Sequence, residues 1–391
     1  MSNADKTKRG NSLKRVLVYM MKLCEELGYI SSFEENYKKG RPGYTDQNQF
    51  KAPYKITFSD NTEWLVFSTT SLRDRIKEQY WDTFNLKELN PNISEAYLVY
   101  PDGLDASDKQ AFISKNTKIQ NGGEFSPLNA LMSQESFFNR IEAYALRTLS
   151  LAQQKDRKGN NFEKRIASIL NNPCNFDKWK NNDSVLEGLH YITFEEIVTK
   201  FGLVRNEIAS IEATSDKTVI GLLPSGGPVK TDVLVTIAYE DGSSKYFTIS
   251  CKRTSQSSVS VHQYSADAFA NVLDSTDIDL RRVLNAFQTC GNKRDMNPAD
   301  VQLLESKLQP LILDLCRWAL GGIGGEGNPD TQWANYILAY DNNTESISIH
   351  TTDEYCTILA NDSTRTFNTP FSWTYQGTRG TNIQLKCPIF L

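Results

Sequence analysis

The chain has 391 residues, which suits two domains better than one, and its content of 39% hydrophobic and 23% charged residues is ordinary for a soluble globular protein. No apolar run approaches the about 18 residues that a membrane span needs. The polar N-terminus lacks the apolar core of a signal peptide, so we expect a cytoplasmic protein. Seven cysteines without a Cys-x-x-Cys pair indicate reduced thiols, and three scattered histidines argue against a zinc site.

The net charge of −4 argues mildly against a nucleic-acid partner, but the charge is unevenly distributed along the chain. The windows 242–266 and 363–391 contain Lys and Arg but no acidic residue, although the chain has 47 acids. The local field, rather than the whole-chain average, decides whether nucleic acid binds. The two windows are therefore candidate binding segments, unless they are simply strands rich in Ser and Thr.

The first 145 residues show apolar spacing and turn residues typical of a small α/β domain. The predicted elements are a helix over 12–28, two strands over 53–71 around Asp60-Asn61, a helix over 72–84, a strand over 95–103 and a helix over 107–119.

The remaining residues, 146–391, alternate helical and strand patterns without an internal repeat. A helical pattern over 137–172 is interrupted at Lys158-Gly159, and a hairpin over 226–254 comes after it. Further on we predict helices over 262–273, 279–287 and 298–320, the last strained at Pro310, and strands over 333–341 and 346–355. The glycines of "GGIGGEG" match a dinucleotide fingerprint, but they follow a helix and precede no helix, so we interpret them as a loop.

The hairpin concentrates the polar chemistry of the chain. Side chains alternate along a strand, so Ser250 and Lys252 share one face, while Phe247, Ile249 and Cys251 lie on the other. Together with Asp232 they could hold Mg²⁺ and position a water for attack on a phosphodiester. This is the arrangement of PD-(D/E)xK nucleases with Ser in place of the second acid, although any hairpin with an outward Asp and Lys can imitate it.

The register of this hairpin tests the hypothesis. A two-residue turn at Asp241-Gly242 would set Asp232 opposite Cys251, on the core face, because a one-residue slip reverses every side chain. A three-residue loop over 241–243 would set Asp232 opposite Lys252 instead, and a β-bulge near Asp232 would have the same effect. We therefore predict an odd-length loop or a bulge.

Four stretches in order resemble the MspI-type restriction endonucleases and extend over roughly 150–391. "PSGGPVKTDVLVTI" and "FTISCKRTSQSSVSVHQYSADAF" are similar to the family's active-site region, in which Ser-Pro-Lys-Thr-Asp leads to Asn-x-Lys. The separation of Asp232 from Ser250 equals the family's separation of Asp from Asn. "NNFEKRIASIL", "LDLCRWAL" and "FSWTYQGTRGTNIQLKCP" resemble further family segments. The resemblance implies an α/β fold, with a PD-(D/E)xK restriction-endonuclease-like mixed sheet flanked by helices.

The resemblance also implies roles for four catalytic residues and a cofactor, Mg²⁺. Asp232 would be the principal metal ligand, and Glu163 would reach the metal from the preceding helix unless it is a solvated carboxylate. Ser250, in place of the family's Asn, would be a weak neutral ligand. Lys252 would orient or deprotonate the attacking water and stabilise charge on the phosphate.

Residues that read DNA are implied in the same way. Gln384 and Lys386, two apart on a strand, would read base edges in the major groove. Ser260 matches a base-contacting Ser, and Gln263 stands where the family has Glu. Helix capping by Ser260 and an exposed position for the others are the structural alternatives. A weaker set, in which the spacing slips by one residue, comprises Thr374, Thr378 and Arg379.

The implied function is that of a type II restriction endonuclease making Mg²⁺-dependent double-strand cuts in DNA, at a short GC-rich palindrome such as CCGG. A cognate DNA methyltransferase would be its genetic partner, and the protein would be a monomer or homodimer. A repair or junction nuclease, or a DNA-binding protein that has lost cleavage, are the alternatives. The additional domain over 1–145 could bind DNA, dimerise or be a degenerate nuclease-like fold. Its "FSTTSLR" (67–73) has no acid-x-Lys pair.

Overall fold

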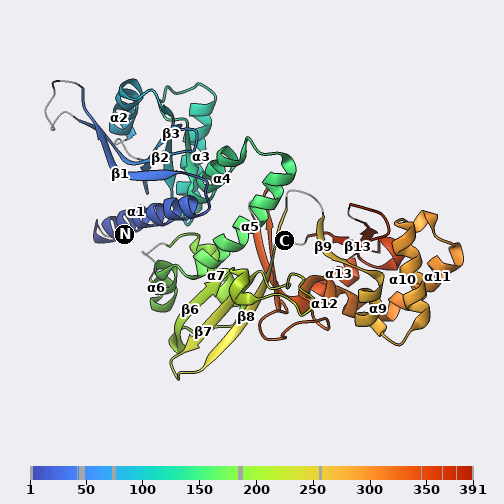
Figure 1. Ribbon diagram of the computed structural model, residues 1–391. Coiled ribbons are helices and arrows are strands. Elements are labelled where there is room, and N and C mark those ends of the chain that lie inside the picture. Colours follow the sequence, from blue (N-terminus) through green and yellow to red (C-terminus); the bar gives the residue numbers. More distant parts are fainter. Residues whose placement is uncertain are drawn as a thin grey trace. The chain divides into compact units, whose positions relative to one another are not determined.

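The computed structural model describes residues 3–41, 43, 49–72, 76–183, 188–254, 258–344, 346–362, 364–375 and 377–389. The chain forms two compact units (Figure 1). The N-terminal unit comprises residues 1–157 and 168–195, and the C-terminal unit comprises 158–167 and 196–391. Among the described residues, no helix has the length and apolar character needed to cross a bilayer.

The N-terminal unit is built on a five-stranded mixed sheet in the order β1-β2-β3-β4-β5. The first three strands form an antiparallel meander, and β4 and β5 run parallel to β3. Its elements are α1 (Asn3–Glu26), β1 (Ser32–Lys39), β2 (Phe50–Thr57), β3 (Glu63–Ser68), α2 (Ile76–Leu89), β4 (Ile93–Tyr100), α3 (Ala106–Gln120), β5 (Ala130–Ser133), α4 (Gln134–Leu146) and α6 (Pro173–Asn181).

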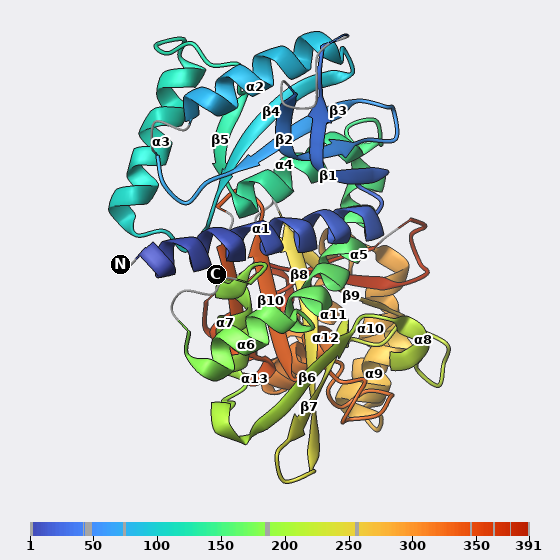
Figure 2. The ribbon, with the colours of Figure 1, turned by 90° about the vertical axis from the view of Figure 1, so that its left-hand side faces the viewer.

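Helices cover both faces of this sheet (Figure 2). The apolar side of α1 and α4 packs on one face, where Trp64, Val66 and Tyr97 are buried. The alternate residues Leu65 and Leu98 lie in a second core with residues of α2 and α3. The alternation along β3 and β4 therefore makes the unit a three-layer α/β sandwich.

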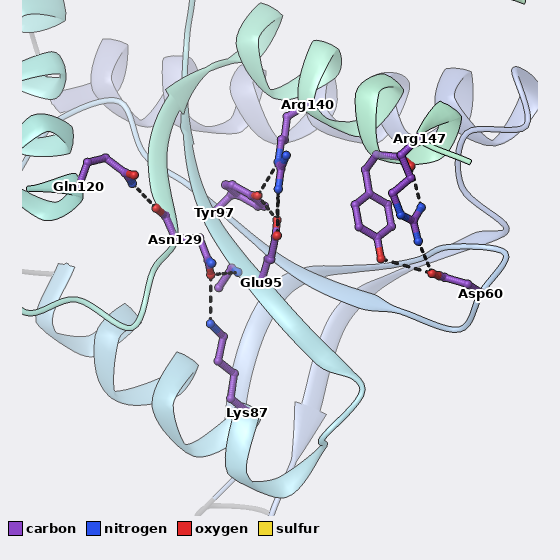
Figure 3. Close-up of polar contacts among 10 residues, drawn as sticks. Asp60, Lys87, Glu95, Tyr97, Gln120, Asn129, Arg140 and Arg147 are labelled. Atoms are coloured by element: carbon purple, nitrogen blue, oxygen red, sulfur yellow. Dashed lines mark hydrogen bonds and ion pairs between the residues drawn. The ribbon is translucent and has the colours of Figure 1, made fainter. Parts of the chain in front are cut away.

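Polar side chains fasten α4 to the sheet (Figure 3). Arg140 on α4 donates to both carboxylate oxygens of Glu95 at 2.9 and 3.0 Å and to the hydroxyl of Tyr97 at 2.9 Å. Arg147, just after α4, forms an ion pair with Asp60 in the β2–β3 loop. These contacts fix the β2–β3 loop relative to α4.

The C-terminal unit contains a five-stranded sheet, β11-β10-β8-β7-β6, and a three-stranded sheet, β12-β13-β9. In the larger sheet, β6, β7 and β8 form an antiparallel meander, β10 runs parallel to β8, and β11 is antiparallel to β10. The strands are β6 (Ile208–Thr214), β7 (Val233–Tyr239), β8 (Ser244–Thr254), β9 (Val259–Tyr264), β10 (Tyr336–Asp341), β11 (Ser346–Thr351), β12 (Ser372–Thr374) and β13 (Ile383–Cys387).

The helices of this unit pack mainly on the smaller sheet, where Trp318, Phe269, Phe287 and Trp373 form a buried aromatic core. They are α8 (Lys217–Ile220), α9 (Ala266–Asp274), α10 (Ile278–Cys290), α11 (Pro298–Leu308), α12 (Ile312–Gly321) and α13 (Thr352–Asp362). Two further helices, α5 (Leu151–Leu170) and α7 (Tyr191–Lys200), contribute residues to both units. The mixed sheet flanked by helices, with an additional N-terminal α/β unit, confirms the predicted fold class.

Several predicted elements differ from the structure for identifiable reasons. The helix expected over 262–273 begins only at Ala266, because Ser265 caps it by accepting from the Ala268 N–H, and the preceding residues form β9. The strand expected over 346–355 ends at Thr351, where α13 starts. The helical pattern over 137–172 breaks before Leu151 and not at Lys158-Gly159. The strain at Pro310 is confirmed, since a short 3₁₀ segment separates α11 from α12 there.

Candidate active site

The β7–β8 hairpin has an odd-length loop, which places Asp232 on the same face as Ser250 and Lys252. Tyr239 donates its N–H to the Ser243 carbonyl at 2.9 Å, so the loop is the three residues 240–242. Pairs run regularly from Ala238–Ser244 to Val233–Ile249. The odd loop is confirmed without a bulge, but it lies one residue earlier than predicted. Asp232 therefore lies beside Ser250, not opposite Lys252, and remains on the polar face.

Asp232, just before β7, is held by three groups of β8. Its Oδ2 accepts the Ser250 hydroxyl at 3.2 Å and the Cys251 N–H at 2.8 Å, and it lies 3.5 Å from the Lys252 ammonium. Lys252 also donates to the Ser250 hydroxyl at 2.7 Å and to the Cys251 carbonyl at 3.2 Å. Ser250 is fully buried, so this cluster is fixed by the strand and not by mobile surface side chains.

Glu163 reaches the same cluster from α5 through a cation that the sequence did not single out. The ammonium of Lys217, on the short helix α8, lies 3.2 Å from Glu163 Oε2 and 3.4 Å from Asp232 Oδ1. Two carboxylates from distant segments thus face one positive charge. The structure brings together Asp232, Ser250, Lys252 and Glu163, with Lys217 between the two acids.

The electrostatics of the cluster centre on Glu163. Burial, followed by the charge of Asp232, raises its pKa from 4.5 to about 7, although Lys217 and Lys252 act in the opposite direction. Burial alone would lower the pKa of Lys217, but Asp232 and Glu163 outweigh it and raise that pKa. The site therefore has one carboxylate that can hold or release a proton near neutral pH.

The two carboxylates and the neighbouring hydroxyl fit a hard divalent cation that takes few of its ligands from the protein. Both acids present an oxygen to the same position, which the Lys217 ammonium reaches. Among the described residues, no three or more His, Cys, Asp or Glu side chains gather to hold a metal. Any further protein ligands would be neutral oxygens such as the Ser250 hydroxyl, and Mg²⁺ commonly keeps several waters with one or two carboxylates.

A second lysine missed by the sequence reasoning is Lys230, two residues before Asp232. Its ammonium donates to the Val261 carbonyl of β9 at 2.5 Å and so links the hairpin to the smaller sheet. Burial, followed by the nearby charge of Lys252, lowers its pKa to about 7. The available signal was its place in "VKTD", next to the acid. For Lys217 the sequence offered no signal.

The smaller sheet gathers the predicted base-reading residues. Gln384 on β13 pairs with Gln263 on β9, and Lys386 pairs with Ser260. A register shift between Leu385 and Lys386 gives β9 one extra residue. Because of this bulge, Ser260 and Gln263 share one face although an odd number of positions separates them.

The predicted base-reading residues differ in their exposure to solvent. Ser260 and Gln263 are exposed and Lys386 is half-buried, whereas Gln384 is 7% exposed and already interacts within the chain. The alternative that Ser260 caps a helix is wrong, since it is the second residue of β9 and Ser265 caps the helix that follows.

The three weaker candidates lie on and after β12. Thr374 pairs with Gln384 and so joins the same sheet. Thr378 and Arg379 lie in the β12–β13 loop, where Arg379 forms an ion pair with Asp295 at 2.8 Å. The structure thus brings Thr374 to the sheet that holds the predicted base-reading residues, while Arg379 pairs with an acid of its own chain.

Comparisons with known proteins identify the family of the chain. The family model described as restriction endonuclease MspI matches residues 140–387, so the chain belongs to that family. The type II restriction enzyme BsuFI from Bacillus subtilis is 27% identical over 378 residues, covering 93% of this chain and 92% of BsuFI. The type II restriction enzyme MspI from Moraxella sp is 23% identical over 241 residues, covering 59% of this chain and 89% of MspI.

A solved structure shows the same fold. The restriction endonuclease MspI in complex with its cognate DNA superposes with a TM-score of 0.54 at 18% identity, covering 64% of this chain and 98% of that one. The similarity to BsuFI, at 93% of this chain, also extends into the N-terminal unit.

Proposed function

We propose that the chain is a type II restriction endonuclease that makes sequence-specific, Mg²⁺-dependent double-strand cuts in DNA. One observation carries the proposal: Asp232, Ser250, Lys252 and Glu163 converge within the segment that matches the family. Two relatives of that family bear the name of type II restriction enzymes. The same observation supports the assignment of these four residues as the catalytic set.

Asp232 and Glu163 would hold the metal, with Ser250 as a neutral neighbour. When bound, Mg²⁺ would lower the pKa of a coordinated water and offset the charge on the phosphate. The Cys251 N–H and the Ser250 hydroxyl fix Oδ2 of Asp232, which leaves Oδ1 directed toward Lys217 and Glu163. The orientation of the acid is therefore set before the substrate binds.

Lys252 would stabilise charge during hydrolysis, while Glu163 would change its protonation when the metal binds. Attack of water on phosphorus would form one P–O bond and break the P–O3′ bond. The water would lose a proton and the O3′ leaving group would take one up from solvent, which gives a 5′-phosphate and a 3′-hydroxyl. The ammonium of Lys252, fixed at 2.7 Å from Ser250, would stabilise the charge that develops on the phosphate oxygens. Glu163 has a pKa of about 7 without metal, so it would give up its proton as Mg²⁺ binds and would then act as a carboxylate ligand.

The reading strands support sequence specificity. Lys386, Ser260 and Gln263 present polar groups from one face of a small sheet, and such a face can enter a major groove. Lys suits the O6 and N7 of guanine, which is compatible with the short GC-rich palindrome, such as CCGG, that the family resemblance implies. We further propose a cognate DNA methyltransferase as genetic partner, cytoplasmic location, and action as a monomer or homodimer.

Plasmid digestion tests the proposal. The full chain is incubated with plasmid in Mg²⁺ and in EDTA, beside Asp232→Asn and Lys252→Ala variants. Discrete Mg²⁺-dependent bands from the wild type alone are expected, and run-off sequencing of the ends then gives the target.

Each other outcome points to an alternative. A smear would indicate a nonspecific repair-type nuclease, and a gel shift without cutting would indicate a binding protein. Cutting by Asp232→Asn at the wild-type rate would overturn the active-site assignment.

A further inference from the structure

The N-terminal unit repeats the core topology of the C-terminal unit. In each, a helix precedes an antiparallel three-stranded meander, and a fourth strand runs parallel to the third. The strands β1, β2, β3 and β4 thus correspond in order and direction to β6, β7, β8 and β10. The fifth strands differ, because β5 is parallel and β11 antiparallel to its neighbour.

The two central hairpins agree in detail. In β2–β3, Phe58 donates to the Thr62 carbonyl at 2.9 Å across a three-residue loop, as Tyr239 donates to Ser243. The third loop residue has a positive φ in both, 65° at Asn61 and 85° at Gly242.

An aspartate also caps each loop in the same way. Asp60 accepts the Thr62 N–H at 3.1 Å, and Asp241 accepts the Ser243 N–H at 2.8 Å. Because both loops have the same length and register, positions in one hairpin correspond one to one with positions in the other.

This correspondence shows what the N-terminal unit has in place of catalytic groups. Counting from the loops along the strands, Asp232 corresponds to Lys51, and Lys252 corresponds to Ser71. The principal metal-binding acid is thus replaced by a cation, and the catalytic lysine by a hydroxyl. A lysine at the acid's position cannot ligate Mg²⁺ but can bind a phosphate directly.

Around Lys51 lies a basic cavity of about 700 Å³ between α1, β1, β2 and α2. Five cations line it: Lys14, Arg15, Lys22, Lys38 and Lys51. All five are exposed, and the described residues provide none of them with an ion-pair partner. Two acids, Glu35 and Asp82, also line the cavity, which leaves an excess of positive charge. Elsewhere in this unit, Arg140 and Arg147 are neutralised by acids.

We propose that the N-terminal unit is a nuclease-like fold without catalytic groups, and that its basic cavity binds the phosphodiester backbone of double-stranded DNA. A DNA backbone is the expected occupant for two reasons. The cavity surrounds Lys51, which corresponds to the proposed catalytic acid Asp232, and its lining has more cations than acids. The choice of DNA over another polyanion rests on the proposed function. Such contacts hold DNA irrespective of its sequence.

Salt-dependent binding tests the proposal in the full-length chain. Affinity for a fluorescent duplex without CCGG is measured by anisotropy in EDTA over a series of salt concentrations. Lys22→Ala/Lys51→Ala is compared with Lys109→Ala/Lys118→Ala, which removes two exposed lysines of α3 and so matches the change in charge. Each lost phosphate contact should lower the slope of log affinity against log salt by about 0.9. We expect a loss of about two in slope for the cavity variant, and none for the control.

Mapping by lysine acetylation gives a second readout. The duplex should protect Lys22 and Lys51, but not Lys109, from the reagent, as measured by mass spectrometry. Equal slopes for the two double variants, or protection of Lys51 by a mononucleotide and not by the duplex, would overturn the proposal. Both measurements omit Mg²⁺, so a wild type that binds through the cavity but never cuts plasmid refutes the proposed function alone.

Discussion

Proton release should accompany metal binding at the proposed active site, because Glu163 holds a proton below about pH 7. Burial and the charge of Asp232 raise the pKa of Glu163 from 4.5 to about 7. At 1.36 kcal/mol per unit, this shift means that the folded site disfavours ionised Glu163 by about 3 kcal/mol. A divalent cation bound to both acids would reverse this preference and displace the proton.

The stability of the metal-free protein should fall as the pH rises, because the pKa of Glu163 is higher in the folded state than in the unfolded state. The metal-free protein gains stability from protonated Glu163 below pH 4.5, and loses it progressively as the pH rises from 4.5 to 7. Cation affinity should show the opposite dependence, falling up to tenfold per pH unit below 7 and levelling off above it. With a pKa of about 7, binding should release about 0.9 proton at pH 6 and about 0.1 at pH 8.

Calorimetric titration with Mn²⁺, without DNA, measures this release directly. The observed heat is compared in two buffers of different ionisation enthalpy at each pH, and Mn²⁺ binding is counted independently by electron paramagnetic resonance. Glu163→Gln is the matched control, which should bind Mn²⁺ more weakly at pH 8 and release no proton at pH 6. Equal proton release at pH 6 and pH 8, or release that persists in Glu163→Gln, would refute the reasoning.

Three further predictions concern other parts of the C-terminal unit. Lys217→Met should tighten Mn²⁺ binding at pH 8 by up to about fivefold, since a partly exposed ion pair contributes about 1 kcal/mol or less; weaker binding would show that Lys217 supports the cation. Lys386→Ala should cost about 1–3 kcal/mol of discrimination at one base pair in competition binding, whereas a uniform loss for all sequences would make Lys386 a backbone contact. In urea unfolding, Gly242→Asn should cost less than Gly242→Val, because the space around Gly242 is open and only its φ of 85° is demanding; equal losses would contradict this.

The sequence allowed prediction of features that depend on local rules. The strand pair around Asp60-Asn61 and the break at Pro310 follow from turn residues and from the missing N–H of proline. The odd hairpin loop followed from requiring one face for Asp232 and Lys252. The start of α5 was also encoded, since Ser150 and Gln153 form a reciprocal capping pair. The interruption predicted at Lys158-Gly159 was wrong, because a glycine within a helix costs only about 1 kcal/mol and α5 continues through it.

Features that depend on tertiary contacts could not be predicted in this way. The position of Lys217 depends on how the chain between β6 and β7 folds back over α5, and no periodicity encodes that path. The shared face of Ser260 and Gln263 needs a bulge that strict alternation excludes. Burial of Gln384 likewise results from strands that are distant in sequence.

The two hairpins show why a repeated fold can go unnoticed in a sequence. Register and loop conformation need only a capping aspartate, one residue that tolerates positive φ, and alternating apolar positions, and many different residues satisfy those requirements. Catalysis, by contrast, depends on the identity of a few side chains on the polar face. Lys51 in place of an acid therefore leaves the fold intact while reversing the charge at that position. A search for acid-x-Lys pairs misses both hairpins, because residues 250–252 are Ser-Cys-Lys and the corresponding residues 69–71 are Thr-Thr-Ser. The shared geometry becomes visible only when both registers are known.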